Sequence, residues 1–126
     1  MTSPQILVVD DEPPLLDLLV SLLPNHEVDT ASNGSEALEL LQRQTYDLVI
    51  SDWGMPVVSG LEVAEKVKQQ TPDTIVVLLT GWEFEGTAVE DSTDIDLIFS
   101  KPFEKDDIKQ IINQAVQLQE QRKSLV

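Results

Sequence analysis

The sequence predicts an α/β fold in which five parallel strands form one sheet covered by helices on both faces. Short apolar runs alternate with segments of helical periodicity along most of the 126 residues. The runs at 48–50 and 75–79 are entirely apolar, as in strands buried on both faces. Residues 28–30 instead alternate between apolar and polar, which is typical of an edge strand. The doubly wound strand order 2-1-3-4-5 satisfies these observations.

The first strand is expected at residues 6–9, directly before the acidic residues 10–12. Pro13 and Pro14 suit the first turn of a helix, where a missing N–H group costs nothing. An apolar helix face follows, made of Leu15, Leu16, Leu18, Leu19, Leu22 and Leu23, and Pro24 is expected to end the helix. After the edge strand, Ser35 is the expected N-cap of a second helix that ends near Gln44.

A loop after the third strand contains Gly54 and Gly60, and a third helix is expected to end near Thr71. The helix is predicted from the helical spacing of four residues, Leu61, Ala64, Val67 and Lys68. Residues 83–96 contain Gly, Ser and Thr, so the fourth helix is expected to be short or irregular. A fifth strand is expected at 97–100. The last helix should begin at Glu104 and become polar from Gln117 onward, which leaves a core of about 5–118 and a polar tail.

Composition excludes several classes of function. The chain carries 23 acidic and 8 basic residues, and a net charge of -15 repels nucleic-acid phosphates, so direct nucleic-acid binding is not expected. It has no cysteine, which excludes disulfides and thiolate metal sites. No run is long and apolar enough to insert into a membrane. We therefore expect a soluble cytoplasmic protein.

Polar side chains gather where the predicted strands end. Asp10 and Asp11 follow the first strand, Asp52 ends the third, Thr80 follows the fourth and Lys101 follows the fifth. Clustered carboxylates repel one another unless a cation lies between them, and oxygen ligands suit Mg²⁺. A hydroxyl and a lysine ammonium suit an oxyanion such as a phosphoryl group. Considered alone, the acids at 10–12 are typical of helix-capping residues. Together with the carboxylate, hydroxyl and ammonium groups at the other strand ends, they can support phosphoryl transfer to a carboxylate.

These residues carry a resemblance to a known family. The acidic pair Asp10-Asp11, the segment 52–56 (Asp-Trp-Gly-Met-Pro) with Gly60, Thr80 and the run 101–103 (Lys-Pro-Phe) occur in order, each at a predicted strand end. The chain resembles a receiver domain of a two-component response regulator or hybrid histidine kinase over essentially its whole length. The resemblance implies a flavodoxin-like (βα)5 three-layer sandwich, with residues 1–126 as one receiver domain.

The resemblance also implies a role for each residue. Asp52 would take a phosphoryl group from a phosphohistidine of a histidine kinase or phosphotransfer protein, or from a small phosphodonor. Lys101 would pair with a phosphoryl oxygen, and Thr80 would donate a hydrogen bond to one. The Mg²⁺ ligands would be Asp11, Asp52 and the backbone carbonyl of Gly54, while Asp10 would act through a metal-bound water.

The implied function is a signalling switch that acts on a downstream effector or an attached output domain, with chemistry only at its own Asp52 and so no enzyme activity in the usual sense. Two alternatives remain open: a receiver-like interaction module that is not phosphorylated, and a Mg²⁺-dependent aspartyl-phosphate hydrolase. The hydrolase is disfavoured because its usual Asp-x-Asp pattern is missing after the first strand. The chain also departs from the family at Ile98, where an aromatic residue is usual, so the route of the signal out of the site is expected to differ.

Overall fold

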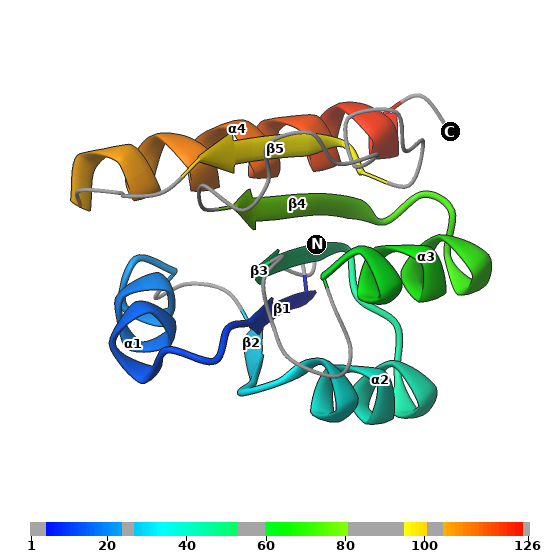
Figure 1. The fold of residues 1–126 in the computed structure, drawn as a ribbon. Helices are drawn as coiled ribbons and strands as arrows, with labels where there is room; N and C mark the ends of the chain where they lie inside the picture. Colours follow the sequence, from blue (N-terminus) through cyan, green and yellow to red (C-terminus); the bar gives the residue numbers. More distant parts are fainter. Residues whose placement is uncertain (1–4, 24–26, 53–59, 81–94, 101–104, 125–126) are drawn as a thin grey trace.

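The computed structural model describes residues 5–23, 27–52, 60–80, 95–100 and 105–124, and these form one parallel sheet between two layers of helices (Figure 1). The strands are β1 (Gln5–Val9), β2 (Glu27–Ala31), β3 (Leu48–Asp52), β4 (Ile75–Thr80) and β5 (Leu97–Ser100). Their order is β2-β1-β3-β4-β5, and every neighbouring pair is parallel. The predicted fold class and strand order are therefore confirmed.

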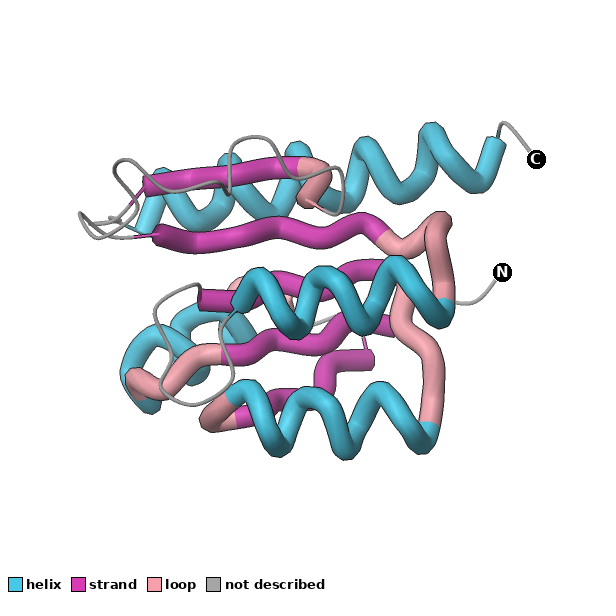
Figure 2. The backbone as a smooth tube through the Cα atoms, turned by 45° about the vertical axis from the view of Figure 1, so that its right-hand side comes forward, coloured by secondary structure: helices cyan, strands magenta, loops and turns pink. Residues whose placement is uncertain are grey.

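The helices in the described part of the chain are α1 (Pro13–Ser21), α2 (Gly34–Arg43), α3 (Gly60–Gln70) and α4 (Lys105–Ser124). Helices α1 and α4 cover one face of the sheet, and α2 and α3 cover the other (Figures 1 and 2). The helix expected within 83–96 falls mainly on residues outside the described ranges. No helix in the described ranges is long and apolar enough to cross a membrane.

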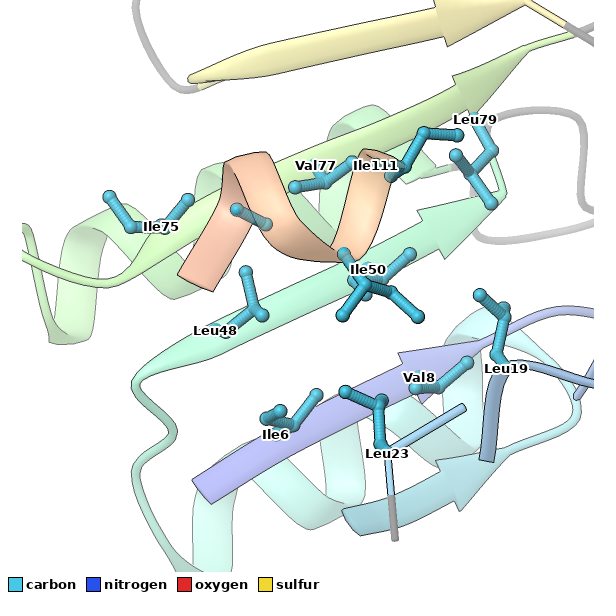
Figure 3. Packing of buried hydrophobic residues seen from close by; sticks show 12 residues of the cluster. Ile6, Val8, Leu19, Leu23, Leu48, Ile50, Ile75, Val77, Leu79 and Ile111 are labelled. Atoms are coloured by element: carbon cyan, nitrogen blue, oxygen red, sulfur yellow. The ribbon is translucent and has the colours of Figure 1, made fainter. Parts of the chain in front are cut away.

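Each face of the sheet has its own hydrophobic core because side chains alternate along every strand. On the α1 and α4 face, Ile6 and Val8 of β1 and Leu48 and Ile50 of β3 pack with Ile111 of α4 (Figure 3). On the opposite face, the alternate strand residues pack with α2 and α3. In the central strands β1 and β3 every residue is buried except Gln5 at the start of β1, as their mainly apolar sequences predict.

Three details of the helices refine the sequence prediction. The expected N-cap Ser35 is wrong: Asn33 is the cap, and its side chain accepts a hydrogen bond of 2.8 Å from the backbone N–H of Glu36. Both residue types cap helices well, and the helix begins at Gly34, two residues earlier than a cap at Ser35 implies. Helix α1 ends at Ser21, before the two leucines that the apolar pattern assigned to it. Helix α4 continues through the polar segment to Ser124, and Gln119 within that segment is buried.

Candidate phosphoacceptor site

The register of β1 and β3 brings two aspartates together at the carboxyl edge of the sheet. Val9 pairs with Ser51, so the next residues along the two strands, Asp10 and Asp52, lie side by side. Alternation directs both carboxylates to the face on which Val8 and Ile50 pack. Two acids separated by about forty positions in the sequence therefore meet because their strands are neighbours in register.

The two aspartates are buried, whereas their neighbour Asp11 is exposed. Asp10 is 0% exposed and Asp52 is 4% exposed. One oxygen of Asp10, Oδ1, accepts a 2.8 Å hydrogen bond from the backbone N–H of Glu12, the N-cap residue of α1. The Asp10 N–H group donates to the carbonyl of Ala31 in β2. These bonds fix the Asp10 carboxylate at the point where the chain turns from β1 into α1.

The three carboxylates converge closely enough to share one cation. One oxygen from each of Asp10, Asp11 and Asp52 lies within 4.8 Å of the other two. All three donors are hard, negatively charged oxygens, the type that Mg²⁺ and Ca²⁺ prefer. Bringing three like charges together without a counter-charge is unfavourable, and most of all for the two that are buried. The donor set therefore fits a divalent cation.

The other predicted site residues are only partly within the described structure. Thr80 is the last residue of β4, next to Leu79, which pairs with Asp52. Its backbone therefore lies at the same edge as the aspartates, and its side chain is outside the description. Gly54 and Lys101 both fall outside the described ranges. Gly60 of the sequence motif is the first residue of α3.

A buried hydroxyl beside Asp52 was not identified from the sequence. Ser51 is 0% exposed, and its Oγ donates a 3.0 Å hydrogen bond to the backbone carbonyl of Asp52. The sequence does contain a signal for it, since Ser51 interrupts an otherwise apolar strand directly before the site. The sequence alone does not show that Ser51 is buried, because its neighbours on β1 and β4 are set by the register of the sheet.

A second polar cluster lies at the opposite, amino edge of the sheet and takes no part in the aspartate site. Tyr46 Oη donates a 2.7 Å hydrogen bond to Asp29 Oδ2, and Gln44 Nε2 donates to both groups. A cavity of about 130 Å³ is lined by these residues together with Gln5 and Glu27. Burial, and then the hydrogen bond to Asp29, raises the pKa of Tyr46 to about 12, so its phenol is neutral at physiological pH.

Comparison with known proteins agrees with this geometry. Residues 6–113 match the family model of the response regulator receiver domain. The chain is 37% identical over 92 residues to the response regulator protein PilR of Pseudomonas aeruginosa, which covers 71% of this chain and 21% of that protein. It is 34% identical over 115 residues to the transcriptional regulatory protein GlrR of Escherichia coli, which covers 89% of this chain and 26% of that protein.

Solved structures are also similar to this chain. A response regulator receiver domain protein from Clostridium thermocellum superposes with a TM-score of 0.80 at 31% identity, covering 97% of this chain and 98% of that one. The chain spans only about a fifth to a quarter of the length of PilR and GlrR, so it is similar to one part of each. By its family match, its fold and its relatives, this chain belongs to the receiver domain family of two-component response regulators.

Proposed function

We propose that the chain is a phosphoacceptor switch, in which Asp52 accepts a phosphoryl group in a Mg²⁺-dependent reaction. The observation that carries this proposal is the buried carboxylate of Asp52, which shares a site with Asp10 and Asp11 at the carboxyl edge of a receiver fold. Burial of Asp52 and Asp10 keeps water away from most of the site. Residues 1–126 are proposed to act as one receiver unit.

In the proposed reaction, an oxygen of Asp52 attacks the phosphorus atom of the donor in line with the bond that breaks. The new bond joins Asp52 to phosphorus, and the bond between phosphorus and the donor's leaving group is lost. A bound Mg²⁺ would supply positive charge opposite the phosphoryl oxygens. Asp11, Asp52 and the carbonyl of Gly54 are the proposed ligands, and Asp10 would hold a metal-bound water.

Two further residues are proposed to contact the transferred group. Lys101 would pair its ammonium group with one phosphoryl oxygen, and Thr80 would donate its hydroxyl to another. The end of β4 lies beside that of β3, which supports this role for Thr80. These contacts would exist only after transfer, and they would shift an equilibrium between two conformations of the domain.

The proposed partners follow from the same chemistry. The donor would be the phosphohistidine of a sensor histidine kinase or of a phosphotransfer protein in the cytoplasm. The receiver would then act on a downstream effector or on an attached output domain, since the chain is similar to only part of each longer relative. A net charge of -15 argues against direct contact with nucleic acid by this domain. Its chemistry would be confined to its own Asp52.

Intact-mass measurement with Mg²⁺ and a small acyl phosphate tests the proposal. Wild type should gain one phosphoryl group, and chelation of Mg²⁺ or the substitution Asp52→Asn should prevent the gain. Asp47→Asn is the matched control, because Asp47 lies at the other end of the same strand segment and should leave phosphorylation intact. If wild type stays unmodified while a known receiver reacts, the chain is instead a receiver-like interaction module.

A further inference from the structure

Ser51 is the polar member of an otherwise apolar row that crosses the sheet beside the aspartate site. The register places it between Val9 of β1 and Leu78 of β4, and the row continues to Ala31 at one end and to Ile98 at the other. The rows beneath it are apolar on β1, β3 and β4 as well. Packing alone would accept an alanine at this position, so the hydroxyl group needs a separate explanation.

Buried polar side chains in the described ranges concentrate at this edge. Asp10, Ser51 and Asp52 are buried together at the ends of β1 and β3, while Thr74 and Gln119 are buried elsewhere. A buried hydroxyl is costly unless it makes a hydrogen bond, and Ser51 Oγ makes one to the carbonyl oxygen of Asp52 at 3.0 Å. The bond is therefore directed at the main chain of the phosphoacceptor itself.

That carbonyl belongs to the peptide group by which the chain leaves the sheet. Its orientation is set by the ψ angle of Asp52, and the rigid peptide plane transmits this orientation to the nitrogen of the next residue, Trp53. A hydroxyl that holds the Asp52 carbonyl thus limits the ψ angle of Asp52, and with it the rotamers that are open to the acceptor carboxylate.

We propose that Ser51 is a positioning residue for cation binding and phosphoryl transfer: its buried hydroxyl holds the Asp52 carbonyl and so fixes the main chain that carries the acceptor carboxylate. Ser51 itself touches neither the cation nor the phosphoryl group. The inference rests on the proposed function, because it assigns Ser51 to the same Mg²⁺ site.

The test compares Ser51→Ala with Thr74→Val. Thr74 is a matched control because its buried hydroxyl also donates to a backbone carbonyl, that of Tyr46, but at the amino edge of the sheet. Mg²⁺ affinity is measured by tryptophan fluorescence, and the rate of phosphorylation is measured at saturating Mg²⁺. Ser51→Ala should weaken Mg²⁺ binding by about three- to tenfold and slow phosphorylation, whereas Thr74→Val should change each by less than about twofold.

Ser51→Thr keeps the hydroxyl and should restore Mg²⁺ affinity to within about twofold of wild type. The proposal is overturned if Ser51→Ala binds Mg²⁺ as wild type does, if Thr74→Val weakens binding equally, or if Ser51→Thr behaves like Ser51→Ala. Failure of the proposed function has a different signature: wild type would bind Mg²⁺ without becoming phosphorylated, and the titrations would still decide the role of Ser51.

Discussion

At the scale of single residues, the site divides its three carboxylates between two environments. Asp10 and Asp52 are buried at adjacent strand ends, and Asp11 lies on the surface beside them. Burial holds a carboxylate in one orientation and keeps water away from it, and a phosphoryl acceptor would need both. An exposed carboxylate adds charge and a ligand while it keeps the site open to the cation. The different burial of adjacent residues thus matches the roles proposed for them.

The exposed member offers a clean test of the cation site. Asp11→Asn should weaken Mg²⁺ binding by about tenfold, because it removes one negative charge a few ångströms from the ion. Isothermal titration calorimetry gives the affinity. Asp17→Asn makes the same change of charge at another exposed position, on α1, and should leave the affinity nearly unchanged. Equal losses in the two variants would attribute the effect to net charge and would argue against Asp11 as a ligand.

At the amino edge of the sheet, the raised pKa of Tyr46 predicts that the free energy of unfolding depends on pH. Its pKa is raised from 10.0 to about 12 in the folded protein, so the folded chain keeps the phenol proton after the unfolded chain has lost it. Its contribution to stability is therefore complete below about pH 10 and falls as the pH rises toward about 12. At about 1.36 kcal/mol per pKa unit, the full loss of stability should be about 3 kcal/mol.

Tyr46 is the single tyrosine of the chain, so tyrosinate absorbance reports its ionisation directly. The titration midpoint should lie well above 10.0 in the folded protein and return to that value in denaturant. In chemical denaturation, the stability difference between wild type and Tyr46→Phe should shrink across the alkaline range. A folded-state midpoint near 10.0 would contradict the buried, hydrogen-bonded phenol.

At the scale of elements, side-chain hydrogen bonds join the amino ends of the strands. Asp96, just before β5, accepts from Lys68 Nζ of α3 and from the backbone N–H of Val76 in β4, both at 2.8 Å. Lys68 also donates to the carbonyl of Thr74. One carboxylate therefore links a helix and two strands, and both partners of the ion pair are largely shielded from water.

Removing the Asp96 carboxylate should weaken the connection between α3, β4 and the start of β5. Asp96→Ala leaves Lys68 and the Val76 N–H without this acceptor, and the free energy of unfolding should fall by about 2 kcal/mol. Asp73→Ala is the control, since Asp73 is an exposed residue in the nearby turn. Urea denaturation measures both variants. A loss for Asp96→Ala no larger than that for Asp73→Ala would show that the ion pair adds little.

The elements also show what could be predicted from the sequence. Asp10, Asp11 and Asp52 could be identified because each lies at the end of a buried apolar run, which is a local signal. The cap of α2 could not be assigned, since Asn33 and Ser35 are both good capping residues and only the helix start decides between them. Ser51 and Asp96 could not be assigned roles either. The burial of Ser51 depends on the strands that flank it, and the partners of Asp96 lie on β4 and on a helix distant in sequence.

At the scale of the whole molecule, the two edges of the sheet have different characters. The amino edge is held by hydrogen bonds such as those of Tyr46, Thr74 and Asp96. The carboxyl edge instead gathers like charges around Asp52. Hydrogen-bonded groups and clustered carboxylates therefore lie at opposite edges of the sheet, and a change of charge at Asp52 would act first on the carboxyl edge.

The identity of the modified residue tests directly whether Asp52 is the phosphoacceptor. The protein is phosphorylated with a small acyl phosphate and Mg²⁺, then treated with hydroxylamine, which converts an aspartyl phosphate to a stable hydroxamate. Peptide mass spectrometry then locates the modified residue. Modification is expected at Asp52 alone, and it should depend on Mg²⁺ and be absent in Asp52→Asn. Modification at Asp10 or Asp11, or equal labelling of the Asp52→Asn variant, would contradict it.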